Sequence, residues 1–114
     1  MRYIMFVCAD PAGESFDPAL DNIEEWVSTN DKSGRRIIGH RLAGLATAKT
    51  VRVRGNRLLI TDGPFAETKE WIAGFDLLEC AGLDEAIEIA SKHPMARFGR
   101  IEVRPLWTGE VMRG

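Results

Sequence analysis

The order of hydrophobic patterns along this 114-residue chain constrains its fold more than any single motif does. Short apolar runs rich in β-forming residues alternate with two segments of helical periodicity. The resulting order is strand, helix, strand, hairpin, strand, helix, strand, which is the split βαβ, or ferredoxin-like, pattern with an inserted β-hairpin. We therefore expect an α+β fold whose antiparallel sheet is covered by two helices on one face. The expected strands cover residues 2–8, 35–42, 49–62 as a hairpin, 71–80 and 99–106.

Residues that start and stop helices bound both helical segments. Asp17 can cap the first helix, Pro18 suits its first position, and Gly34 ends it. The second helix lies within residues 82–94, and Pro94 ends it because the residue before a proline disfavours helix. One side of this helix carries Leu83, Ala86, Ile87 and Ala90.

Length and composition predict a single domain over residues 1–114. We expect a second subunit to stabilise this domain. The chain is 45% hydrophobic and 28% charged, as is usual for a globular protein. The two helices leave one face of the sheet uncovered, and a sheet that is apolar on both sides usually finds a partner. We therefore expect a homodimer in which two sheets pack together as a dimeric α+β barrel. The apolar residues available to the two faces are Tyr3, Met5, Phe75 and Leu78.

Several classes of function are not expected from the composition. The net charge is −2 and the positive charges are scattered, so the sequence indicates no basic patch of the kind that binds nucleic acid. No apolar run has the roughly 20 residues of a membrane span, and the first strand is too short for a secretory signal, so we expect a cytoplasmic protein. Cys8 and Cys80 should lie at opposite ends of neighbouring strands as free thiols. No metal-ligand spacing and no phosphate-binding glycine loop is present, so no metal or cofactor is expected.

The connection at residues 62–70, "DGPFAETKE", is longer than the two to five residues that neighbouring strands need. Its Asp62 has two possible roles, either turn chemistry beside Gly63 or service as a general base or ligand anchor in a cleft. Phe65 is expected to fill an apolar gap at a subunit boundary rather than to stack on a ligand. We expect Glu67 to turn inward and pair with an arginine, with catalysis as the alternative.

At this point the sequence resembles a known family. The run "VRVRGNRLLITDGPFAETKEWIAGFDLLEC", followed by "LDEAIEIA" and "GRIEVRP", resembles the YCII-related proteins, specifically the subgroup named for its Asp-Gly-Pro-Phe motif. Here that motif is residues 62–65, extended by Ala66 and Glu67, and the similarity runs from "RYIMF" to "EVRPL".

The resemblance implies a dimeric ferredoxin-like barrel, in agreement with the order of the patterns. Similar barrels include small isomerases, lyases and monooxygenases that often work without a bound cofactor. Some relatives are fused to, or encoded beside, sigma factors. Better-studied members have a proposed His–Asp pair in the inter-subunit cleft. Asp62 is the residue that corresponds to that aspartate, and the motif places no histidine.

Further candidates come from single polar residues on predicted strands. His40 shares a strand side with Ile38 and Leu42, so it is either a satisfied, partly buried residue or a cleft residue that can exchange protons. Asp76 interrupts an apolar strand and must face a cleft, water or an arginine. Arg104 can clamp an anion, or bridge Glu102 or Asp76, with the bridge preferred. His93 is expected to be structural, as a cation at a helix end.

These observations lead to a ranked hypothesis. We expect a cytoplasmic homodimer with an inter-subunit pocket that performs proton transfer on a small organic molecule, as an isomerase, lyase or hydrolase. Asp62 would be the base or anchor, His40 its acid–base partner and Arg104 the anion clamp, with Asp76, Phe65 and Glu67 contacting the ligand. The alternatives are a non-catalytic ligand- or protein-binding module, for which the resemblance implies a link to sigma-factor regulation, and a scaffold domain.

Overall fold

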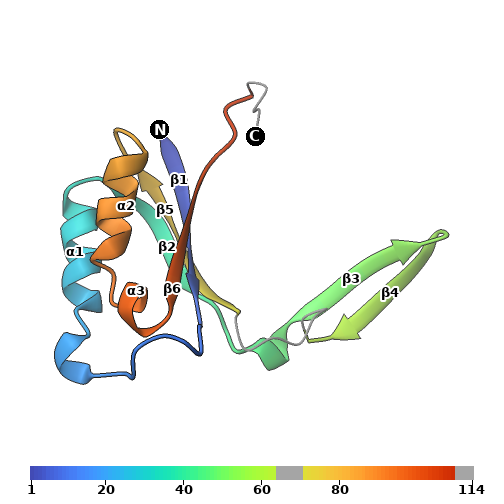
Figure 1. Cartoon of the computed structure of the whole chain (residues 1–114). Coiled ribbons are helices and arrows are strands. Elements are labelled where there is room, and N and C mark those ends of the chain that lie inside the picture. The colour runs from blue at the N-terminus through green and yellow to red at the C-terminus, as the bar shows by residue number, and fades with distance from the viewer. Residues whose placement is uncertain (64–70, 110–114) are drawn as a thin grey trace.

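The computed structural model describes residues 1–63 and 71–109 of the chain. Its strands are β1 (Arg2–Cys8), β2 (Arg36–Arg41), β3 (Lys49–Arg54), β4 (Arg57–Asp62), β5 (Ile72–Glu79) and β6 (Arg100–Pro105). Four of them form an antiparallel sheet in the order β2-β5-β1-β6, and β3 pairs only with β4 in a separate hairpin (Figure 1). This strand order is that of the ferredoxin-like fold, so the predicted α+β class and the inserted hairpin are confirmed.

Helices α1 (Ile23–Lys32) and α2 (Leu83–Ser91) lie side by side on one face of the four-stranded sheet, as predicted (Figure 1). A third helix, α3 (Met95–Phe98), was not predicted. Pro94 is its N-cap residue, so this proline follows one helix and starts the next. Helix α3 leads the chain back to the sheet, and it forms one wall of the cavity described below.

The first helix begins later than the sequence predicts. Asp17 does cap a turn, but that turn is a short 3-10 helix over Pro18–Leu20. The backbone is extended at Asp21, and the α-helix begins only at Ile23. Gly34 follows the helix with a φ of +77°, which agrees with the predicted end.

The hairpin forms where the sequence places it, after a 3-10 turn at Leu45–Thr47. Gly55 and Asn56 both have positive φ, 55° and 63°, as a tight type I′ turn requires. The register places Val51 opposite Ile60 and Val53 opposite Leu58, so alternation gathers these four aliphatic side chains on one side. All four are 58–63% exposed, and Figure 1 shows the hairpin projecting away from the main sheet.

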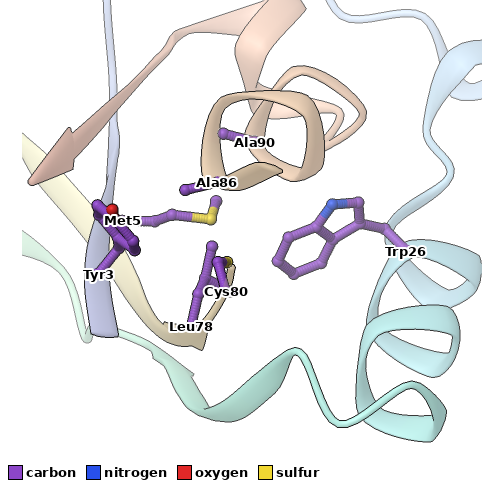
Figure 2. Packing of buried hydrophobic residues seen from close by; sticks show 7 residues of the cluster. All are labelled: Tyr3, Met5, Trp26, Leu78, Cys80, Ala86 and Ala90. Carbon is purple, nitrogen blue, oxygen red and sulfur yellow. The ribbon is translucent and has the colours of Figure 1, made fainter. Parts of the chain in front are cut away.

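The core lies between the sheet and the two helices (Figure 2). Met5 and Leu78 are fully buried, and Trp26 reaches from α1 toward Leu78 (Figure 2). The indole Nε1–H of Trp26 donates to the backbone carbonyl of Ile89 at 2.8 Å, which ties α1 to α2. The small side chains of α2 let it pack closely on the sheet. The buried cluster comprises Tyr3, Met5, Trp26, Leu78, Cys80, Ala86 and Ala90.

One detail of the predicted packing is wrong. Leu83 and Ile87 were expected on the buried side of α2, but they are 49% and 50% exposed, because the helix turns its alanines toward the sheet. The sequence did not determine how the apolar residues of the strands divide between the two faces of the sheet. Tyr3, Met5 and Leu78 pack under the helices, and only Phe75 faces the other way.

The face without helices is nevertheless apolar at its centre. Phe75 lies opposite Phe6 in the register, and Leu77 lies opposite Ile4. These four residues alternate with the buried residues of β1 and β5 and are only partly buried. We call this group the open face.

Cys8 and Cys80 are both buried, and no disulfide joins them. They lie at opposite ends of the sheet, since Cys8 pairs with Ile72 at the start of β5 and Cys80 follows its end. No helix in the described part of the chain is long and apolar enough to cross a membrane.

Candidate functional site

A cavity of about 620 Å³ opens on the helix-covered side of the sheet, within a single chain. It lies where β2 ends and β5 begins, and α1, α3 and the loop before α1 form its other walls. This volume falls within the range of small-molecule pockets. The larger apolar side chains of its lining include Phe16, Ile23, Trp26, Val27, Met95 and Phe98.

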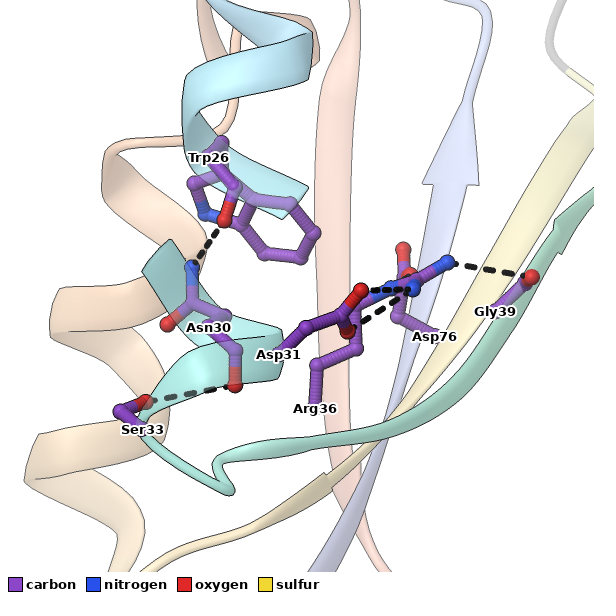
Figure 3. Close-up of polar contacts among 7 residues, drawn as sticks. All are labelled: Trp26, Asn30, Asp31, Ser33, Arg36, Gly39 and Asp76. Carbon is purple, nitrogen blue, oxygen red and sulfur yellow. Dashed lines mark hydrogen bonds and ion pairs between the residues drawn. The ribbon is translucent and has the colours of Figure 1, made fainter. Parts of the chain in front are cut away.

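A buried ion pair forms one wall of this cavity (Figure 3). The Nε–H of Arg36 donates to Oδ1 of Asp76 at 2.7 Å, and the two side chains are only 17% and 8% exposed. The other guanidinium nitrogens are also engaged. Nη1 donates to both carboxylate oxygens of Asp31, at 3.0 and 3.3 Å, and Nη2 donates to the carbonyl of Gly39 at 3.1 Å. Arg36 therefore connects α1, β2 and β5.

Gly39 makes room for this pair. It lies on β2 directly opposite Asp76. A Cβ atom at position 39 would be 1.9 Å from Oδ1 of Asp76 and 2.6 Å from Nη2 of Arg36. Both atoms are held by hydrogen bonds in a buried place, so any larger residue would displace the ion pair.

The Asp76 carboxylate has the properties of a proton acceptor. Burial raises its pKa above the ordinary value of 3.8, and the hydrogen bond from Arg36 offsets this only in part. Arg36 holds Oδ1, and in the described part of the chain no donor reaches Oδ2. Asp76 lines the cavity, so Oδ2 is the oxygen that can take a proton from a ligand there.

His93 lines the same cavity and is only 6% exposed. Its Nδ1 accepts the backbone N–H of Met95 at 3.0 Å, so the neutral ring carries its proton on Nε2. The ring packs edge-on against Trp26, with 4.7 Å between ring centroids. Burial lowers the pKa of His93 to about 4. The predicted cation at a helix end is therefore wrong, and His93 is a neutral hydrogen-bond donor.

Residues 1–109 match the family model of the YCII-related domain. The chain belongs to the YCII-related family. An uncharacterised protein of Rhizobium meliloti (strain 1021) is 46% identical over 68 residues, which are 58% of this chain and 55% of that protein. The chain thus spans about half the length of this curated relative.

A solved structure has the same fold. It is a 5-chloro-2-hydroxyhydroquinone dehydrochlorinase from Burkholderia phenoliruptrix AC1100, in complex with 2,5-dihydroxybenzoquinone. The superposition has a TM-score of 0.51 and covers 96% of both chains at 14% sequence identity. At this identity the likeness establishes the fold of the YCII-related protein and no more.

The catalytic residues predicted from the sequence do not meet in this cavity. Asp62 ends the separate hairpin, where its exposed carboxylate pairs with Lys49. His40 contributes to the cavity lining, but its ring lies on the open face, 6.0 Å from the ring of Phe75. No hydrogen bond or ion pair joins Asp62 and His40 in the described ranges. Phe65 and Glu67 lie outside the described residues.

The predicted ligand contacts Asp76 and Arg104 are on opposite faces of the sheet. Arg104 pairs in register with Ile4 on the open face. It is also three strand spacings from β2, on the order of 14 Å at ~4.8 Å each, so it lies far from His40. Neither of the expected bridges from Arg104 forms, because Asp76 pairs with Arg36 and Glu102 lies 3.6 Å from Arg100.

Two residues of the cavity were not selected from the sequence. Arg36 belongs to the pair "RR" at 35–36, which opens the second predicted strand, and its neighbour Arg35 pairs with Glu85. His93 was assigned a structural role. A signal for Arg36 was available, since Gly39 inside a strand indicates close approach of other atoms. Among residues 1–63 and 71–109, no group of three His, Cys, Asp or Glu could hold a metal ion.

The lowered pKa of His93 predicts a specific pH dependence of stability. In the unfolded chain this histidine takes up a proton near pH 6.5, and in the folded protein only near pH 4. The unfolded state therefore binds more protons between these values, and stability falls as pH falls through this window, by up to about 3 kcal/mol. Urea unfolding at pH 7 and pH 5 should show about 2 kcal/mol of this loss. His93→Asn, which keeps an acceptor for the Met95 N–H, should show less of it. Equal losses in both proteins would contradict the neutral, buried state of His93.

Proposed function

We propose that this protein is a small-molecule enzyme that removes a proton from a carbon next to a carbonyl group, in the cavity between α1 and the β2–β5 end of the sheet. One observation carries the proposal. Asp76 has a raised pKa and a free carboxylate oxygen, and it lines the same cavity as the neutral imidazole of His93. A proton acceptor and a neutral hydrogen-bond donor are the two groups that enolisation needs.

The steps follow from the chemistry of the two side chains. Oδ2 of Asp76 takes the proton, and the electron pair of the C–H bond moves onto the carbonyl oxygen to give an enolate. The Nε2–H of His93 donates a hydrogen bond to that oxygen and stabilises the developing charge. Return of the proton at another carbon completes an isomerisation, and expulsion of a leaving group completes an elimination. Arg36 holds Asp76 in place through the other carboxylate oxygen.

The named activity of the structural neighbour is consistent with this class of reaction. That protein is called a dehydrochlorinase, and its structure contains a dihydroxybenzoquinone. Loss of hydrogen chloride from an organic molecule is an elimination in which a proton must be accepted. The shared fold makes such chemistry a reasonable starting point for the choice of compounds.

Hydrogen–deuterium exchange tests the proposal across a range of candidate substrates. Proton NMR in D₂O would follow exchange at carbons next to the carbonyl in a panel of small ketones, enones and quinones. The wild-type protein should accelerate exchange in part of the panel, and Asp76→Asn should slow it by about 100-fold or more. Thermal melts would show that the variant is folded.

Asp62, the base predicted from the sequence, supplies the matched comparison for Asp76. Asp62→Asn should leave exchange unchanged if Asp76 is the base. If exchange instead follows Asp62 and survives in Asp76→Asn, the predicted pair of Asp62 and His40 performs the chemistry and the proposal is wrong. Saturable binding of panel compounds with no exchange would favour the ligand-binding module.

We also propose that the protein is a homodimer through the open face of its sheet. Phe6 and Phe75 lie at the centre of this face without a covering helix. The hairpin adds four exposed aliphatic residues, and an isolated two-stranded hairpin is at best marginally stable. A second copy would cover both surfaces through one two-fold axis. An inter-subunit pocket would then lie on the open face, separate from the cavity of Asp76.

Light scattering at micromolar concentration should therefore give about twice the 12.7 kDa chain mass. Phe6→Glu and Leu58→Glu should each shift the protein toward monomer, because a charge would be buried in the interface. Ile87→Glu is the matched control, since this residue is equally apolar and 50% exposed but lies on the helix side. A monomeric wild-type protein, or loss of the dimer in Ile87→Glu alone, would contradict this arrangement.

A further inference from the structure

The charged residues of the cavity are not equally engaged. Four charged side chains belong to its lining, namely Asp21, Arg36, Arg41 and Asp76. Arg36 and Asp76 pair with each other, and Oδ1 of Asp21 accepts the backbone N–H of Ile23 at 3.3 Å. Arg41 has no hydrogen bond or ion pair with any residue of the described ranges. Within those ranges, it is the one cation of the lining whose charge is not met by a protein carboxylate.

The register places Arg41 on the cavity side of the sheet. It lies opposite Gly74, two residues from Gly39 and on the same strand side as that glycine. The side chain at position 41 thus leaves the strand on the face that holds Asp76. Residues two apart on a strand are separated by roughly 7 Å, which is about the width of a substituted six-membered ring.

Aromatic side chains line the same cavity as Arg41. Phe16 and Phe98 meet edge to face with 5.2 Å between ring centroids, and both line the cavity. Phe16 is 64% exposed although it has this partner, so one side of its ring is available to a ligand. The loop that carries Phe16 is fixed to α3, because Arg97 donates to both carboxylate oxygens of Glu14 at 3.2 Å.

We propose that the cavity binds a small, flat carboxylate, with its charged end at Arg41 and its ring against Phe16 and Phe98. The free guanidinium supplies two parallel N–H donors for a carboxylate, the geometry that arginine is best suited to bind. The exposed side of the Phe16 ring favours a planar body that can stack on it. The spacing along β2 and β5 then places the far side of the ring beside Asp76. This inference rests on the site of the proposed function and names the class of ligand that the site takes.

Fragment binding to the full chain tests the ligand class. Benzoate, benzamide, benzylamine and acetate would each be titrated into ¹⁵N-labelled protein at fixed ionic strength, with the Trp26 indole N–H as reporter. Benzoate should bind at least tenfold more tightly than the neutral benzamide, the cationic benzylamine or the ringless acetate. Equal binding of benzamide would overturn the role of charge, and equal binding of acetate would overturn the role of the ring. Tighter binding of benzylamine would mean that the site prefers a cation to an anion, which would contradict the proposal.

Single substitutions test whether Arg41 is the residue that binds the carboxylate. Arg41→Gln should weaken benzoate binding by tenfold or more, and Phe16→Ala should weaken it while leaving acetate unchanged. Arg54→Gln, at the exposed end of the hairpin, is the control that should bind like wild type. If Arg41→Gln binds benzoate as wild type does, or if Arg104→Gln weakens it instead, the proposal is wrong.

The outcome is separable from that of the proposed function. Asp76→Asn removes the proton acceptor but leaves the anchor, so it should retain benzoate binding while losing exchange. Binding that depends on Arg41, with exchange unaffected by Asp76→Asn, would uphold the ligand class and reject the proton transfer. Exchange that depends on Asp76, with benzoate binding unaffected by Arg41→Gln, would reject the ligand class alone.

Discussion

The buried pair between Arg36 and Asp76 is the interaction on which the arrangement of the site depends. One guanidinium joins the end of α1, the carbonyl of Gly39 on β2 and the carboxylate on β5. Burying such a pair costs desolvation energy that a pair of apolar residues would not incur, so it is weak evidence for stability. Its effect on function is clearer. It fixes a carboxylate with a raised pKa at the wall of a cavity.

The two faces of the sheet have different roles in this account. The helix-covered face holds the cavity, with Asp76, His93 and Arg41 among its polar residues. The open face and the hairpin present apolar residues and are proposed to bind a second copy. This separation explains why one short chain can use both sides of a four-stranded sheet. It also means that variants on one face should leave the property of the other face intact.

Local signals in the sequence were sufficient for most of the fold. Strand patterns, the Gly55-Asn56 turn and Gly34 predicted elements that the structure contains, because each depends on residues close together in the chain. The candidate site depended on distant pairs. Asp76 was recognised as needing a partner, but Arg36 is 40 residues away and nothing local connects them. His93 was misjudged because its burial depends on how Trp26 and α3 pack around it.

The most direct test of the central claim is a titration of the Asp76 carboxyl carbon by ¹³C NMR, assigned with Asp76→Asn. The account predicts a midpoint above the ordinary 3.8, because burial outweighs the hydrogen bond from Arg36. Such a carboxylate is a better proton acceptor than an exposed one. A midpoint below 3.8 would mean that Arg36 dominates and that Asp76 is a structural anion. The cavity would then lack the base on which the proposed reaction rests.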